Sequence, residues 1–286
     1  MRVIDMECSV PKRATGEASA AVPAPPAAER PAGYGMANYE RIFRSREGGG
    51  DARPKTELSA YVELMEKAGI VRAVPFGTTN DEVAELRREY PDRFIGLARI
   101  SAFLGMRGVR ELEQRVREQG FQALGVSALV DGIPASDRRF YPLYAKAAEL
   151  GIPVRIYSSM NYATDRPYDL GHPRHLDQVA IDFPELVIVC GHVGYPWTEE
   201  MIAVARKHEN VYIDTSAYTT KRLPAELVSF MKTHTGQRKV LFGTNYPMVD
   251  PGHVLTGIDQ LGLSADARED YLRGNAERVF GLRLRE

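Results

Sequence analysis

One stretch near the C-terminus decides the fold, and it reads Val240-Leu241-Phe242-Gly243-Thr244-Asn245-Tyr246-Pro247. A short apolar run ends there in a polar residue that Gly and Pro hold in a turn, which is typical of a buried strand. Further upstream, the stretch Leu186-Val187-Ile188-Val189-Cys190-Gly191-His192-Val193-Gly194 repeats this design with a histidine at its tip. Two buried strands that deliver an imidazole and an amide to one rim are typical of a barrel enzyme.

The chain around these stretches alternates apolar strand-like runs with helix-like segments. Strands are predicted at residues 2–6, 70–76, 94–100, 121–126, 153–157, 186–190, 211–214 and 240–242. Strict alternation with near-continuous apolar strands indicates a parallel sheet. Eight such units, without a Gly-rich phosphate-binding turn after the first strand, favour a closed α/β (β/α)8 TIM barrel over a doubly wound open sheet.

A long insertion follows the first strand within what we predict to be a single domain over residues 1–286. Residues 12–55 are rich in Pro and Ala, as in the run Ala21-Val22-Pro23-Ala24-Pro25-Pro26. Prolines remove backbone donors and fix φ, so this segment cannot be one regular helix. A loop of this length is either disordered or functional, and we expect either a disordered loop or a lid over the barrel mouth.

Charge and composition exclude several classes of partner. The chain of 286 residues holds 37 basic and 38 acidic residues for a net charge of −1, so no global field favours nucleic acid or an anionic membrane. An acid at Asp5 interrupts any secretory signal, and no apolar run approaches the ~20 residues of a membrane span. We therefore expect a cytoplasmic protein, in which Cys8 and Cys190 are small buried hydrophobes rather than a disulfide.

Polar side chains at the predicted strand ends form the candidate site. They include Asp5, Glu7, Ser9, Arg99, Tyr157, His192, Asp214, Ser216 and Asn245. One imidazole among carboxylates suits general acid–base chemistry on a small polar substrate, and His192 is the candidate acid or base. Two further residues lie close to this rim in the sequence: His172 faces the rim or caps a loop, and Trp197 lines the pocket or packs.

Four motifs resemble the amidohydrolase-related barrels, the group that contains aminocarboxymuconate-semialdehyde decarboxylase and γ-resorcylate decarboxylase. They are Gly191-His192-Val193-Gly194, the stretch from Asn210 to Ser216, Leu241 to Pro247, and Gly274-Asn275-Ala276. The ordered match covers at least residues 94–282, and Val3-Ile4-Asp5 fits the first strand of that family. The resemblance implies a (β/α)8 fold, a single Zn or Mn ion, and non-oxidative decarboxylation or hydrolysis.

The chain departs from the ligand pattern that the resemblance implies. Members of the family place His-x-His or Glu-x-His after the first strand, a His on the fifth strand and an Asp on the eighth. Aligned by motif, this chain has Glu7-Cys8-Ser9, Tyr157 and Asn245 at those places, and it keeps His192 as the catalytic base. Neutral hydroxyl and amide groups are poor zinc ligands, so we predict no tightly bound metal.

The leading hypothesis is an amidohydrolase-like enzyme that acts on a small carboxylated or carbonyl-bearing molecule without a metal. The catalytic residues would be His192, Glu7, Asn245 and Tyr157, and the substrate-binding residues Arg99, Asp5, Ser9, His172, Trp197 and Ser216. Arg155 is an alternative carboxylate anchor, although we expect it to point to the wrong face of its strand. Hydrolysis, decarboxylation and a lyase or cyclisation step all stay open. The alternatives are a Zn- or Mn-dependent enzyme with substitute ligands and an inactive small-molecule-binding barrel. Kinship implies a homodimer.

Overall fold

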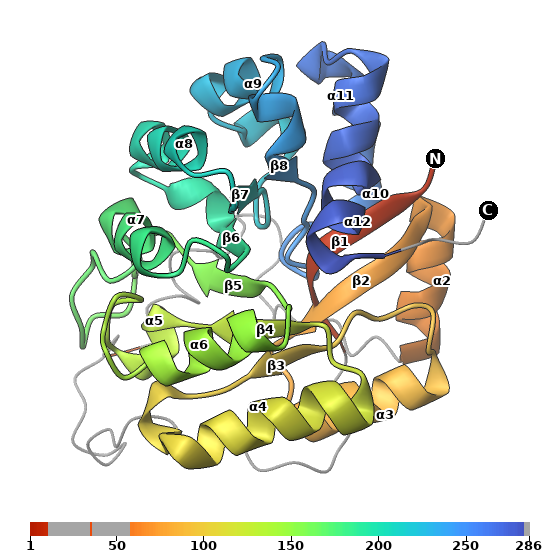
Figure 1. Cartoon of the computed structure of the whole chain (residues 1–286). Coiled ribbons are helices and arrows are strands. Elements are labelled where there is room, and N and C mark those ends of the chain that lie inside the picture. Colours follow the sequence, from red (N-terminus) through yellow and green to blue (C-terminus); the bar gives the residue numbers. More distant parts are fainter. Residues whose placement is uncertain (11–34, 36–57, 283–286) are drawn as a thin grey trace.

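Eight parallel strands run through the computed structural model, which describes residues 1–10, 35 and 58–282 (Figure 1). The strands are β1 (Val3–Ser9), β2 (Ile70–Phe76), β3 (Leu97–Arg99), β4 (Ala123–Val126), β5 (Val154–Tyr157), β6 (Ile188–Gly191), β7 (Val211–Asp214) and β8 (Val240–Leu241). Strands β2 and β7 match their predicted bounds, whereas β1 is longer than predicted and reaches Ser9. The extra residues of β1 carry Glu7 into the barrel.

Helices follow the strands as the periodicity predicts. They are α2 (Leu58–Ala68), α3 (Asn80–Glu89), α4 (Met106–Gln119), α5 (Ala128–Asp131), α6 (Tyr141–Glu149), α7 (Pro173–Asp182), α8 (Thr198–Lys207), α9 (Ala225–Met231), α10 (Pro251–Thr256), α11 (Ala265–Glu269) and α12 (Asn275–Phe280). The sequence did not predict the short α5. Residues 265–280 do not form a single regular α-helix, because a π-helical segment, Asp270–Gly274, separates α11 from α12.

The strand order is sequential around the sheet. Strands β3 to β8 form one continuous parallel ladder, and β1 pairs with β2. Two seams lie between these parts, and one parallel β-bridge joins the chain across each of them: Ala73 pairs with Phe94, and Cys8 pairs with Tyr246. At the second seam the Met6 N–H donates to the Phe242 carbonyl at 3.0 Å. This arrangement brings the first strand beside the last, as a (β/α)8 barrel requires.

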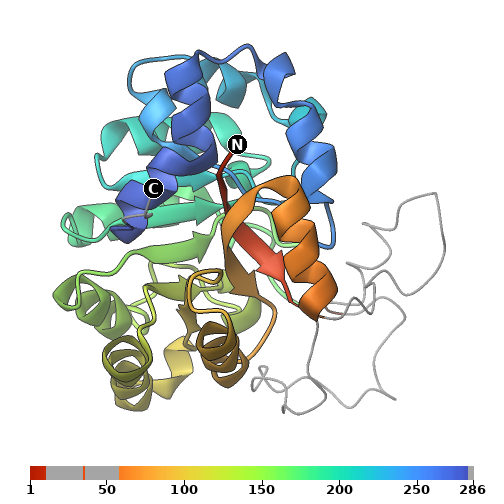
Figure 2. The ribbon, with the colours of Figure 1, turned by 90° about the vertical axis from the view of Figure 1, so that its right-hand side faces the viewer.

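Apolar side chains fill two regions on either side of the strands. A smaller cluster joins Ile4, Met6, Val74, Leu97, Val189 and Leu241 with residues of α12. Strands from around the whole sheet meet in this cluster, so it is the barrel interior. A larger cluster lies between the strands and the surrounding helices, where α2 packs along β2 (Figure 2). Burial on both faces explains why the strands read as unbroken apolar runs.

The predicted loop or lid over residues 12–55 lies outside the described residues, apart from Gly35. The Gly35 N–H donates to Thr164 Oγ1 at 2.8 Å, in the segment between β5 and α7. Among the residues that the structure describes, none of the helices has the length and apolar character needed to span a membrane. The homodimer stays a prediction.

Candidate active site

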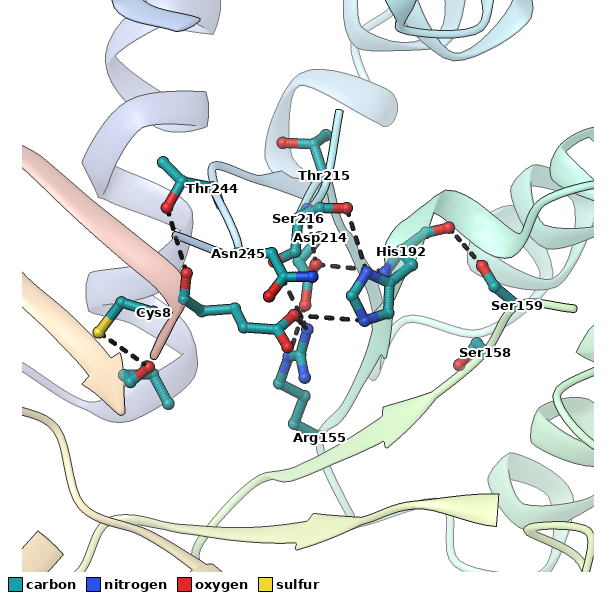
Figure 3. A network of polar contacts seen from close by, with 12 residues as sticks. Cys8, Arg155, Ser158, Ser159, His192, Asp214, Thr215, Ser216, Thr244 and Asn245 are labelled. Atoms are coloured by element: carbon teal, nitrogen blue, oxygen red, sulfur yellow. Dashed lines mark hydrogen bonds and ion pairs between the residues drawn. The ribbon is translucent and has the colours of Figure 1, made fainter. Parts of the chain in front are cut away.

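The carboxyl ends of β1, β5, β6, β7 and β8 bring one polar network together (Figure 3). Three residues predicted from the sequence belong to it: Glu7, His192 and Ser216. Two others, Arg155 and Asp214, complete it; the sequence predicted Asp214 as a polar strand end and Arg155 as an alternative carboxylate anchor, and gave neither a catalytic role. Within this network, the side chains of Glu7, Arg155 and Asp214 are no more than 4% exposed.

Arg155 lies at the centre of the network. Its Nη2 lies 2.6 Å from Glu7 Oε2, and its Nε lies 2.6 Å from Asp214 Oδ2. Burial opposes the charged guanidinium, but the charges of Asp214 and Glu7 outweigh it and raise the pKa of Arg155. The expectation that Arg155 points to the wrong face is therefore wrong. It lies two residues before Tyr157, and alternate residues of a strand share a face.

A glycine makes room for this guanidinium. A Cβ atom at Gly191 would lie 2.9 Å from Arg155 Nη2, closer than such atoms pack. The Gly191-His192 pair therefore has two roles: the glycine leaves space for the arginine, and the next residue carries the imidazole. From the sequence, the motif predicted a functional role for the histidine and none for the glycine.

His192 is held in one orientation by its two ring nitrogens. Nδ1 lies 3.2 Å from the Ser216 carbonyl oxygen, which can only accept, so Nδ1 carries a proton. Nε2 lies 3.3 Å from Glu7 Oε2. His192 itself has a φ of 68°, in the left-handed region that non-glycine residues rarely adopt. The geometry directs Nε2 at the carboxylate, so a proton on that nitrogen is stabilised by Glu7.

Asp214 anchors both the arginine and the histidine turn. Its Oδ1 accepts from the Ser216 N–H at 3.0 Å and from the His192 N–H at 3.3 Å, while Oδ2 faces Arg155. Burial favours the neutral acid, yet the charges of Arg155 and His192 and these hydrogen bonds hold the pKa of Asp214 below its ordinary value. The sequence places Asp214 at the end of a predicted strand, as it does the other candidate residues. That shared position was the signal by which Asp214 could have been assigned to the site.

Asp5 binds the last strand rather than a substrate. It is fully buried, and its carboxylate accepts from the Thr244 Oγ1 at 2.6 Å, the Thr244 N–H at 2.8 Å and the Glu7 N–H at 3.1 Å. Burial raises the pKa of Asp5 to about 7, against the opposing effect of these hydrogen bonds. The predicted substrate contact for Asp5 is corrected, because protein groups occupy its oxygens.

Three other predicted residues make structural contacts. The Tyr157 hydroxyl donates to the Met160 carbonyl at 2.9 Å, so its proton is not directed at a developing oxyanion. The Ser9 N–H donates to the Tyr246 carbonyl at 2.6 Å, at the seam between β1 and the segment after β8. The Asn245 N–H donates to the Glu7 carbonyl at 2.8 Å, which places this residue next to the network through its backbone.

Arg99 offers a second guanidinium near the same site. It lies over the Phe76 ring at 4.8 Å, and Arg155 lies 5.3 Å from the same ring. Burial lowers the pKa of Arg99, while the charges of Glu7 and Asp131 act in the opposite direction. Within residues 1–10, 35 and 58–282, no side chain or carbonyl hydrogen-bonds its guanidinium. A guanidinium carries five N–H donors in a planar fork, which suits the binding of an anion.

His172 and Trp197 belong to an aromatic group between α7 and α8. The His172 Nδ1 accepts from the Arg174 N–H at 3.2 Å and so caps α7, while its Nε2 lies 3.4 Å from Glu200 Oε2. The His172 ring lies 4.5 Å from the Trp197 ring, which also packs on Tyr168. The sequence left two alternatives open for each residue. These contacts are those of a capping residue for His172 and of a packing residue for Trp197.

The residues of the network do not fit a divalent metal ion. Over the described residues, no group of three His, Cys, Asp or Glu side chains is disposed to hold a metal. The oxygens of Asp214 accept from N–H donors, and Glu7 Oε2 faces two nitrogens. A guanidinium also repels a cation at Glu7 by about 4 kcal/mol per unit charge at about 4 Å and an effective dielectric of about 20.

Two curated relatives of this chain are similar over most of its length. The 2-amino-3-carboxymuconate-6-semialdehyde decarboxylase of Dictyostelium discoideum is 25% identical over 236 residues, which span 71% of this chain and 65% of that protein. The gamma-resorcylate decarboxylase of Polaromonas sp. is 26% identical over 254 residues, which span 71% of this chain and 75% of that protein. The chain thus spans just under two thirds of the first relative. Both relatives are named as decarboxylases.

A solved structure and a family match extend over nearly the whole chain. An uncharacterized TIM-barrel protein from Bordetella bronchiseptica is 27% identical with a TM-score of 0.78, and the alignment covers 98% of this chain and 99% of that one. This similarity confirms the predicted TIM-barrel fold. The amidohydrolase family matches residues 4–282. By this match, which confirms the resemblance seen in its strand-end motifs, the chain belongs to the amidohydrolase family.

Proposed function

We propose that this protein is a decarboxylase-like enzyme that releases CO2 from a small unsaturated carboxylate, with His192 as the acid and without a divalent metal. One observation carries the proposal: His192 Nε2 lies 3.3 Å from a buried carboxylate, while Nδ1 is held by the Ser216 carbonyl. This is the arrangement of an imidazole oriented for proton transfer. The names of the two curated relatives support a carboxylated substrate.

Proton transfer to carbon drives the proposed reaction. His192 Nε2–H donates its proton to the substrate carbon that bears the carboxylate, and a C–H bond forms there. The bond from that carbon to the carboxylate then breaks, and its electron pair returns to the conjugated system as CO2 leaves. A proton from solvent restores the imidazolium. Glu7 stabilises the charged ring, and the Ser216 carbonyl keeps it from rotating.

Arg99 supplies the proposed anchor for a substrate anion. Its guanidinium lies on the Phe76 ring at 4.8 Å, and the Arg155 guanidinium lies 5.3 Å from the same ring. A guanidinium binds a carboxylate through two parallel N–H donors, which fixes orientation as well as position. We assign Arg155 no such contact with substrate, since its Nη2 and Nε already pair with Glu7 and Asp214.

A turnover assay after metal removal tests the proposal. The protein is passed over a chelating resin and then mixed with γ-resorcylate and a panel of other hydroxybenzoates and unsaturated carboxylates, while released CO2 is measured. We expect CO2 release that is unchanged by added Mn2+ or Zn2+. Activity that appears only with added metal would overturn the metal-independent chemistry, and inactivity on the whole panel would overturn decarboxylation.

His192→Asn provides the matched active-site variant. Asparagine tolerates the left-handed backbone at this position and cannot act as an acid near neutral pH, so the fold is kept while the proton donor is lost. We expect CO2 release to fall at least about 100-fold, in the range of general acid catalysis. An H192N variant with the wild-type rate would remove His192 from the mechanism.

A further inference from the structure

We infer that Arg155 is a resident cation, which takes over the charge of a divalent metal at the barrel centre and keeps such ions out. The inference rests on the proposed function only for its metal-independent chemistry. The positive charge of Arg155 is built into β5 and cannot dissociate, because guanidinium stays protonated throughout the working pH range. The first and seventh strands supply its two carboxylates, Glu7 and Asp214.

Charge balance supports this assignment. Two buried carboxylates without a cation would destabilise the folded protein, because unpaired charges are unfavourable away from water. Either a metal ion or a fixed guanidinium can neutralise them. In this chain, Arg155 lies 2.6 Å from an oxygen of each one. Its charge neutralises one of their two negative charges. A divalent ion added to this set would leave an excess positive charge among buried side chains.

The surrounding backbone is shaped for the guanidinium. A Cβ atom at Gly191 would lie 2.9 Å from Arg155 Nη2, so the absence of a side chain at Gly191 leaves space for the guanidinium. The Phe76 ring lies 5.3 Å from the guanidinium carbon and covers it as a cation–π partner. The planar guanidinium can donate to two carboxylates in different directions, from Nε and from Nη2. A lysine ammonium is a compact charge and does not reproduce this planar shape. The site is therefore matched to an arginine.

Manganese binding to neutral variants tests the inference. Wild-type protein, Arg155→Met and Arg155→Gln are stripped of metal and titrated with Mn2+, and free Mn2+ is followed by electron paramagnetic resonance. We expect no tight site in the wild type. Each neutral variant should gain about one site with at least 100-fold higher affinity, since its carboxylates and His192 then lack a cation. Wild-type protein that holds one equivalent tightly, or neutral variants that bind no better, would overturn the inference.

Two control variants separate a charge effect from a structural one. Arg155→Lys keeps the positive charge and should gain no Mn2+ site. The double variant R155M/E7Q loses one carboxylate and should lose the gain made by R155M. A neutral variant that folds only with Mn2+ would also support the inference, and one that stays unfolded with Mn2+ would contradict it.

These outcomes are independent of turnover. A wild type that is inactive on carboxylates and indifferent to Mn2+ would overturn the proposed function alone. A wild type that is active without metal, combined with R155M and R155Q variants that gain no Mn2+ site, would overturn the role of Arg155 alone.

Discussion

The smallest scale that matters here is the single oxygen, Glu7 Oε2. It lies 2.6 Å from Arg155 Nη2 and 3.3 Å from His192 Nε2, so one carboxylate contacts both side chains. It therefore links the fixed charge of the arginine to the exchangeable proton of the histidine. A neutral residue at position 7 would break this link without changing the shape of the site.

Glu7→Gln is expected to lower turnover about 100-fold, because the imidazolium of His192 loses the charge that stabilises it. It should also lower the free energy of unfolding by about 3 kcal/mol, the range for removing one partner of a buried ion pair. CO2 release and urea unfolding measure the two effects. The matched control is E66Q, since the Glu66 side chain is 65% exposed and pairs with Arg93 at 3.5 Å. An E7Q variant with wild-type turnover would exclude Glu7 from the mechanism.

At the scale of the element, the residues just after a strand can begin the next helix or carry a side chain of the candidate site. After β2, Thr79 caps α3: its hydroxyl accepts from the Glu82 N–H at 3.2 Å, and the Glu82 carboxylate accepts from the Thr79 N–H at 2.8 Å. This capping box satisfies two backbone donors that a helix start would otherwise leave free. After β6, the same kind of position carries His192 instead. Residues at the strand ends therefore either cap the next helix, as Thr79 does, or carry a candidate catalytic side chain, as His192 does.

Thr79→Ala is expected to lower the free energy of unfolding by about 1 kcal/mol, because the α3 cap loses its acceptor. Thr79→Ser keeps the hydroxyl and should stay within about 0.5 kcal/mol of the wild type. Urea unfolding followed by circular dichroism measures both. Equal losses in the two variants would show that the capping hydroxyl is not the stabilising group.

At the scale of the whole molecule, closing the barrel depends on a contact between its two ends. Asp5 on the first strand accepts hydrogen bonds from the side chain and backbone of Thr244, which follows the last strand. The pair is separated by 239 positions in the sequence. Burial raises the pKa of Asp5 to about 7 from an ordinary value of 3.8, so the folded state binds this proton more tightly than the unfolded chain.

The raised pKa fixes the sign of a pH effect on stability. The contribution of protonated Asp5 is fully present below about pH 4 and is lost as the pH rises toward about 7, by roughly 4 kcal/mol at 1.36 kcal/mol per unit. Asp5→Asn mimics the protonated acid and should lack this loss. We expect the wild type to lose stability relative to D5N between pH 4 and pH 8 in urea unfolding. The control is D92N, whose parent side chain is 91% exposed, and a difference between wild type and D5N that does not vary with pH would contradict the pKa.

The local pattern of the chain determined the strands and the histidine. Strands such as Val211–Asp214 are recognisable because burial on both faces demands an unbroken apolar run, and that demand is local. The same locality explains the failures along the chain. A π-helical segment within residues 265–280 keeps helical periodicity, so the pattern could not reveal the break. The extension of β1 to Ser9 carries polar side chains inward, which apolar periodicity does not signal.

The sequence by itself determined the order of strands and helices and the place of His192 after a buried strand. Only the tertiary structure decided which charges meet. Arg155 lies 59 positions from Asp214 and 148 from Glu7, and no local pattern encodes a contact at such separations. Closure of the sheet sets the register between distant strands, and that register aims the guanidinium at both carboxylates. The arrangement of charges at the centre is therefore a property of the folded barrel.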